Sequence, residues 1–134
     1  MLRFFLALAG YLWALPLTLL GLFLGILTLL TGGRVQIVRG VIEFWGGVMK
    51  WFLKHHLLAK GAAAMTLGHV IFGQARDDLD FAREHEHVHV RQFSRWGIFM
   101  APAYLGCSLY LWLVGKNPYL DNPFEKEAYR VSGS

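Results

Sequence analysis

The stretch His85-Glu86-His87-Val88-His89 is the segment from which the organisation of this chain is predicted. On an α-helix, positions i and i+4 lie one turn apart on the same face. His85 and His89 can therefore direct ring nitrogens at one metal ion, while the carboxylate of Glu86 can reach a water molecule at that metal. The spacing H-E-x-x-H thus predicts a helix with two metal ligands and an adjacent general base. A surface cluster of histidines that binds metal weakly would show a similar pattern.

A third metal ligand is predicted from the C-terminal part of the chain. Catalytic zinc usually has three protein ligands and leaves the fourth position open. An acidic pair, Glu125 and Glu127, follows Pro123. Proline is tolerated at the first position of a helix, and Asp121 or Asn122 can cap that helix. The alternative is a solvated acidic first turn, which the helix dipole favours in any protein.

This arrangement resembles the gluzincin metallopeptidases. In that family a first helix carries H-E-x-x-H, and a later helix supplies a glutamate in the pattern E-x-x-A-D. The resemblance covers roughly residues 64–130. It implies zinc as the cofactor, with His85, His89 and Glu125 as its ligands and Glu86 as the general base.

Three positions depart from the gluzincin pattern. Tyr129 stands where many gluzincins have Asp. Glu127 is an alternative to Glu125 as the ligand, because only the register to Ala128 separates the two. His87 occupies a position that more often holds an uncharged or apolar residue. On a helix it points away from the two ligand histidines, so we exclude it from the metal ligands.

The composition indicates a membrane-associated protein, since 55% of the residues are apolar and the mean hydropathy is +0.41. The run Phe4–Leu30 contains no charged residue and is long enough to span a bilayer. We expect residues 1–33 to form a transmembrane anchor, one tilted helix kinked at Pro16. A re-entrant hairpin that turns near Pro16 is the alternative. The run exceeds the apolar core of about 7–15 residues found in cleaved signal peptides.

A second uncharged run, Gly97–Val114, would also be assigned to the membrane from its hydropathy alone. If it crossed the bilayer, His89 and Glu125 would lie on opposite sides, about 30 Å apart. We therefore expect a helix that enters the membrane only partly and packs beside the first apolar helix. The alternatives are a site at membrane depth and a zinc site that lacks Glu125.

The basic residues predict the orientation of the chain. The positive-inside rule places the segment 31–96 on the cytoplasmic face of the cell inner membrane, because only Arg3 flanks the anchor on its other side. The net charge of +4 and the pI near 9.5 suit anionic lipid headgroups. Nucleic acid is not expected as a partner, since the basic residues alternate with apolar ones next to the anchor. The basic residues of this segment are Arg34, Arg39, Lys50, Lys54, Lys60, Arg76, Arg83, Arg91 and Arg95.

The elements between the two apolar runs follow from local patterns. Val35–Phe44 predicts a strand or a bent pair of strands, and Val48–Lys60 predicts a short amphipathic helix at the interface. Ala62–Phe72 predicts one strand between two glycines. Gln74–Asp80 predicts a polar loop, with Asp80 as the cap of the helix that carries the metal motif.

The predicted fold class is α+β and membrane-associated. A small zincin-like domain, residues 34–134, follows the anchor and includes the apolar helix 97–114. In zincins an edge strand lies beside the active helix, so that the substrate backbone can add to the sheet. Thr66–Phe72 is the candidate for that strand, and His69 within it is expected to be a packed core histidine. The single cysteine, Cys107, cannot form an internal disulfide.

Two classes of function fit these expectations. The first is a membrane-anchored zinc metallopeptidase that hydrolyses a peptide or a membrane protein, with Glu86 as general base. Arg91, Arg95 or His69 would then stabilise the oxyanion. The second is a non-catalytic zincin-like subunit of a larger membrane complex. An open coordination position beside Glu86 favours the enzyme. A fourth protein ligand, or an apolar helix that fills the cleft, favours the subunit.

Overall fold

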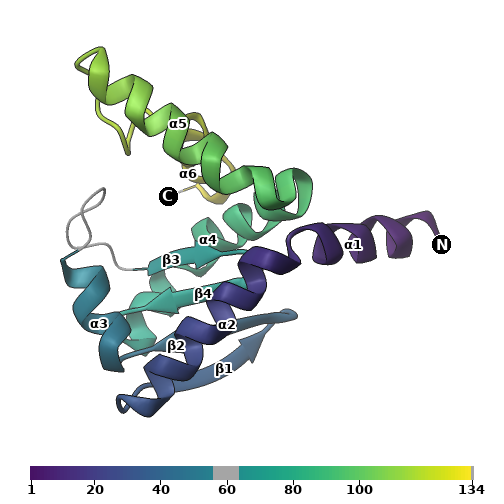
Figure 1. Ribbon diagram of the computed structural model, residues 1–134, viewed down its shortest axis with the longest axis vertical. Helices are drawn as coiled ribbons and strands as arrows, with labels where there is room; N and C mark the ends of the chain where they lie inside the picture. The colour runs from purple at the N-terminus through teal and green to yellow at the C-terminus, as the bar shows by residue number, and fades with distance from the viewer. Residues whose placement is uncertain (56–63, 134) are drawn as a thin grey trace.

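The computed structural model describes residues 1–55 and 64–133, which form an α+β fold (Figure 1), as predicted. In chain order its elements are α1 (Leu2–Trp13), α2 (Leu15–Leu30), β1 (Arg34–Val38), β2 (Val41–Trp45), α3 (Gly47–Lys54), β3 (Ala64–Leu67), β4 (Val70–Gly73), α4 (Arg76–Trp96), the 3-10 turn η1 (Gly97–Phe99), α5 (Met100–Leu113) and α6 (Pro123–Ser132).

The strands form one sheet in the order β1-β2-β4-β3. β1 and β2 are an antiparallel hairpin, β3 and β4 are a second hairpin, and the parallel pairing of β2 with β4 joins them. The predicted strand pair over Val35–Phe44 is confirmed. Its turn falls at Arg39 and Gly40, which both have positive φ (52° and 76°). Two such residues in succession are typical of the tight turns that join antiparallel strands.

The single strand predicted over Ala62–Phe72 is wrong, because β3 and β4 are separated by a turn at Gly68 and His69. Gly68 has a φ of +62°, a conformation that reverses the chain and that glycine adopts without steric cost. Residues 62 and 63 lie outside the described residues. His69 is buried, as expected of a core histidine, and its backbone N–H donates to Oγ1 of Thr18.

Helices cover both faces of the sheet, which makes three layers (Figure 1). α2 and α3 pack on one face, where Phe44, Val70 and Phe72 form the core. α4 packs on the other face, over Val41 and Ile71. The two sets of residues alternate along the strands, as the pleat of a sheet requires.

The N-terminal apolar run is broken into two helices. α1 and α2 are bent by 61° at the break, which falls at Ala14, and Pro16 lies in the first turn of α2. The predicted kink is therefore confirmed. By length and composition alone, the stretch Arg76–Leu113, which comprises α4, η1 and α5, could supply a membrane span. The pair α1–α2 could supply a second span only if the two bent helices cross together.

α4 begins earlier than predicted. The segment Gln74–Asp80 was expected to be a loop, but the helix starts at Arg76, after Ala75, which makes no side-chain cap. Asp80 is not the cap and instead pairs with Arg83 one turn later, at 2.8 Å. Acidic residues in a first helical turn interact favourably with the helix dipole, so a polar segment of this kind can be helical. α3 ends at Lys54, and residues 56–60 of the predicted amphipathic helix lie outside the described residues.

α5 turns the chain back on itself. Its first turns pack near Ala14, at the break between α1 and α2, and the rest projects from the body of the molecule (Figure 1). The expected packing of this helix against the first one therefore holds only at its start. The segment 115–122 then returns along α5, where the Ser108 hydroxyl donates to the carbonyl of Pro118 at 2.8 Å. The Asn122 amide donates to the carbonyl of Tyr104 at 3.1 Å. This return places α6 beside α4.

The close approach of α2 to the sheet can be tested at Gly25. A methyl group at Gly25 would overlap the ring of Phe44. We expect Gly25→Ala to lower the free energy of unfolding by about 1–3 kcal/mol, the usual cost of overpacking, measured by denaturant unfolding in detergent. The matched control is Gly106→Ala in α5, where a methyl group would meet nothing within 4 Å. If Gly25→Ala leaves the free energy of unfolding unchanged, α2 does not pack on the sheet in this way.

Candidate metal centre

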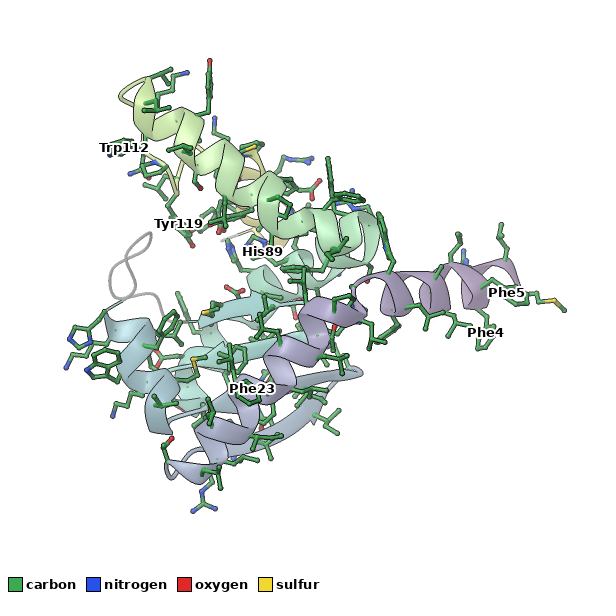
Figure 2. All side chains as sticks on the ribbon, viewed as in Figure 1. Phe4, Phe5, Phe23, His89, Trp112 and Tyr119 are labelled. Atoms are coloured by element: carbon green, nitrogen blue, oxygen red, sulfur yellow. The ribbon has the colours of Figure 1, made fainter. Side chains whose placement is uncertain are left out.

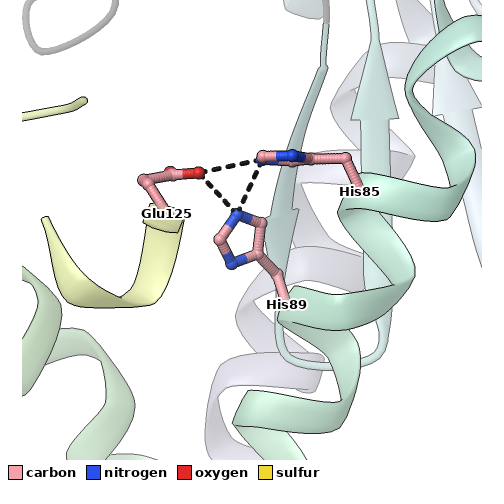
Figure 3. A group of neighbouring side chains, drawn as sticks. All are labelled: His85, His89 and Glu125. Atoms are coloured by element: carbon pink, nitrogen blue, oxygen red, sulfur yellow. Dashed lines mark hydrogen bonds and ion pairs between the residues drawn. The ribbon is translucent and has the colours of Figure 1, made fainter. Parts of the chain in front are cut away.

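Two helices supply the candidate site. One face of α4 packs on the sheet through Leu79 and Val90. A different face of the helix directs His85 and His89 toward Glu125 of α6 (Figure 3). α6 is capped at its N-terminus by Asn122, whose side chain accepts from the backbone N–H of Phe124 at 3.0 Å. The predicted cap is therefore confirmed for Asn122.

His85, His89 and Glu125 meet at one point (Figure 3). The three residues are 4–8% exposed. Oε1 of Glu125 lies 2.9 Å from Nε2 of each histidine, and the two Nε2 atoms are 3.2 Å apart. A tetrahedral zinc ion with bonds of about 2.0–2.1 Å holds its ligand atoms roughly 3.3 Å from one another. The donor set and its spacing therefore fit zinc.

Neighbouring groups orient these donors. Oε1 of Gln92 lies 2.8 Å from Nδ1 of His89, so Nδ1 carries the proton and the Nε2 lone pair is free for a metal. The Tyr104 hydroxyl donates to Oε2 of Glu125 at 2.7 Å, which leaves Oε1 facing the histidines. Sequence reasoning missed both residues. Gln92 was detectable, because it lies three positions after His89 on the same helix face, whereas Tyr104 lies in a run assigned to the membrane.

Glu127, the alternative ligand, lies away from the donors. Its carboxylate accepts from Gln92 at 2.8 Å and from Arg95 at 2.6 Å. Arg95 therefore pairs with Glu127 and not with the donor cluster. His87 faces the sheet, with its Nε2 3.9 Å from Glu43, so its exclusion from the cluster is confirmed. Tyr129 packs its ring edge-on against His85, with the ring centroids 4.4 Å apart.

His69 also lies outside the site. Its Nε2 is 2.8 Å from the Ser94 hydroxyl, and its ring contacts the ring of Tyr11. Neither His69 nor Arg95 is among the residues that line the cavity beside the donors. Arg91 is exposed on α4 and is not in the lining either. None of the three sequence-based candidates for stabilising an oxyanion is therefore brought to this cavity.

Glu86 borders a cavity that reaches the donors. Its Oε2 accepts from the Thr66 hydroxyl of β3 at 2.6 Å, and the side chain is buried. The cavity has a volume of about 310 Å³, and His89 and Glu125 line it together with Glu86. The rest of its wall is mostly apolar and comes from β3, the end of α4, α5 and the return segment: Ala64, Met65, Thr66, Leu67, Phe93, Met100, Ala101, Tyr104, Leu105 and Tyr119.

The ionisation of Glu125 and that of His89 depend on each other. Burial opposes ionisation of Glu125, but hydrogen bonds from His85 and His89 outweigh it and hold the pKa of this carboxyl well below its usual range. Burial likewise lowers the pKa of His89, yet the hydrogen bond to Glu125 and the nearby carboxylates raise it to about 9. Without a metal, the site is therefore an imidazolium paired with a carboxylate.

No known family, no curated protein and no solved structure matches this chain. The interpretation of the site therefore depends on its own geometry.

The two acidic candidates can be separated by metal binding. We expect the purified chain to bind about one zinc ion, and Glu125→Gln to weaken binding by at least roughly 100-fold, beyond the 10–100-fold typical of losing an outer-shell partner. Glu127→Gln is the matched control. It keeps an acceptor for Gln92 and should change the affinity by less than about tenfold. Equal losses in the two variants would contradict the assignment of Glu125.

Zinc binding should also displace a proton. Since His89 is protonated below about pH 9 and a ligand imidazole must be neutral, zinc added at pH 7 should release about one proton from this group. The release should diminish as the pH approaches about 9. Titration calorimetry in two buffers of different ionisation enthalpy measures it. In the metal-free chain the raised pKa of His89 has its own effect on stability. The contribution of His89 is fully present below pH 6.5 and is lost as the pH rises through about 9.

Proposed function

We propose that this chain is a zinc peptidase that acts at a membrane, with Glu86 as its general base. The observation that carries the proposal is the position of one carboxylate. Glu86 lies in the cavity beside His89 and Glu125, but it bonds to Thr66 and not to the donor cluster. A structural metal site has no use for an ordered acid beside its open side, whereas hydrolysis needs one.

The chain's own residues suit peptide hydrolysis. Zinc, when bound, supplies a Lewis acid that polarises a carbonyl and lowers the pKa of water. Glu86 takes a proton from the water as its oxygen adds to the carbonyl carbon. It gives that proton to the nitrogen as the C–N bond breaks. Thr66 fixes the orientation of Glu86, and Tyr104, whose pKa burial raises, stays protonated and holds Glu125.

The space around the donors supports an enzyme more than a scaffold. Among residues 1–55 and 64–133, no fourth His, Cys, Asp or Glu joins His85, His89 and Glu125. No helix of the described chain fills the cavity, which α5 borders from one side. A substrate group can therefore approach the cluster from the side on which Glu86 lies.

The sheet offers a place for an extended peptide. β3 is at the edge of the described sheet, and its residues Ala64–Leu67 line the cavity. A peptide backbone can hydrogen-bond to such an edge as an additional strand, which would bring its carbonyls past the donors. β3 takes the role expected from Thr66–Phe72, because the turn at Gly68 divides that segment. Placement on the cytoplasmic face of the inner membrane stays a prediction from the positive-inside rule.

The role of Glu86 can be tested by one substitution. Glu86→Gln keeps the shape and the acceptor for Thr66 but cannot take a proton. We expect it to bind zinc like the unmodified chain and to lose about 10²–10⁴ in the rate of peptide hydrolysis. The assay is cleavage of a quenched peptide library with zinc content measured in parallel.

Glu84→Gln is the matched control on the same helix, because Glu84 is exposed and pairs with the surface residue Arg39. It should keep full activity. If Glu86→Gln hydrolyses peptides as fast as the unmodified chain, the enzyme proposal fails. If the unmodified chain binds zinc and cleaves no peptide, the non-catalytic subunit of a larger membrane complex replaces it.

A further inference from the structure

α2 has two opposed faces. Gly21, Gly25 and Thr28 are buried against the sheet. The other side is a stripe of exposed apolar residues with helical spacing, and Figure 2 shows Phe23 on that outer side: Pro16, Leu19, Leu20, Phe23, Ile26, Leu27 and Leu30.

α1 and α5 extend this apolar surface. α1 is exposed all round except at Gly10, and it carries Phe4 and Phe5 away from the body of the molecule (Figure 2). α5 buries Ser108 and Leu111 and exposes a stripe on its outer side. That stripe comprises Pro102, Leu105, Leu109, Trp112 and Leu113.

The three surfaces lie on one side of the molecule. In Figure 1, α1, α2 and α5 are nearest the viewer, α2 crosses in front of the strands, and α4 and α6 lie behind. We call the exposed residues of α1, α2 and α5 the apolar platform. Soluble monomers rarely expose continuous apolar patches larger than a few hundred Å², so a platform built from three helices requires a partner.

Acidic residues are absent from the helices of the platform. The elements of the platform contain no acidic residue, and the charged residues in them or directly beside them are basic: Arg3, Arg34 and Lys116. α3, which packs beside α2, adds Lys50 and Lys54 and no acid. All nine acidic residues lie on β2, α4, the return segment and α6. An apolar surface whose own helices carry no acid and which these basic residues flank is complementary to an anionic lipid leaflet.

The packing argues against a helix that crosses the bilayer. α2 contacts all four strands, and β1 and β3 are open edges of the described sheet. Hydrocarbon does not tolerate unpaired sheet edges, so α2 cannot cross without drawing the sheet into it. α5 is accompanied by the return segment, whose Asn117 and Asp121 would be drawn in likewise. Taken singly, α1 and α2 have 12 and 16 residues, short of the ~20 needed to span.

We propose that the apolar platform lies in one leaflet of an anionic bilayer and that the chain crosses the membrane nowhere within its described residues. This attachment replaces the spanning anchor expected from the sequence, and it does not depend on peptidase activity. The broken helix pair and α5 lie along the leaflet, while the sheet, α4 and α6 stay on the aqueous side.

The first test compares the two ends of the N-terminal apolar run. In a Cys107→Ser background, Leu2→Cys and Arg34→Cys each place one thiol at an exposed position. A membrane-impermeant maleimide is applied to sealed right-side-out and inside-out vesicles from cells that express the chain. We expect both positions to react in one type of vesicle and neither to react in the other. Reaction of the two positions in opposite types of vesicle would show a span and overturn the proposal.

The second test measures binding to lipid. Flotation with phosphatidylcholine vesicles that contain phosphatidylglycerol should recover the chain, and pure phosphatidylcholine should bind at least about tenfold less. Phe23→Asp and Trp112→Asp, at platform residues 58% and 65% exposed, should each weaken binding at least about tenfold. Phe81→Asp is the matched control, since Phe81 is 86% exposed on α4, and it should bind within about twofold of the unmodified chain. Equal binding by all three variants would overturn the proposal.

Discussion

The meeting of one carboxylate oxygen with two ring nitrogens constrains the rest of the fold. Glu125 is buried and faces His85 and His89, so the segment between the two helices must leave α4 and return to it. η1, α5 and the return segment supply that path. A buried carboxylate without these partners would be costly, since an isolated charge in a protein interior is strongly disfavoured. The apolar run 97–114 therefore cannot end on the far side of a membrane from α4.

α4 also carries Arg83, and this residue fixes the helix to the sheet. Arg83 donates two hydrogen bonds to Glu43, each 3.0 Å long, and Glu43 is fully buried on β2. The hydrogen bond to Glu43 is the main cause that raises the pKa of Arg83, so this guanidinium stays charged under all ordinary conditions. Such a bidentate pair sets the rotation of the helix on the sheet. That rotation is what brings Glu86 to Thr66 on one side and the two histidines to α6 on the other.

Short-range sequence patterns predicted the residues of the donor cluster, but they did not predict how the surrounding helices and strands pack. The spacing of His85 and His89 and the cap at Asn122 depend on a few neighbouring residues, and both are found in the structure. The turn at Gly68 was missed because a glycine between apolar residues fits a strand interior as well as a hairpin. The buried face of α2 has no distinct signature, since small residues at a helix surface suit a lipid environment and a sheet equally. Tyr104 reaches Glu125 only through the return of α5, which no local pattern encodes.

The separation of the donors along the chain has a consequence for biosynthesis. Glu125 follows His85 by forty positions, and α5 is formed between them. A nascent chain thus exposes two neighbouring imidazoles well before it contains the carboxylate that completes the cluster. Two histidines one turn apart hold a metal far less well than a closed set of three donors. The donor cluster is therefore complete only after α5 has folded back, by which time the sheet and the apolar helices have already been translated.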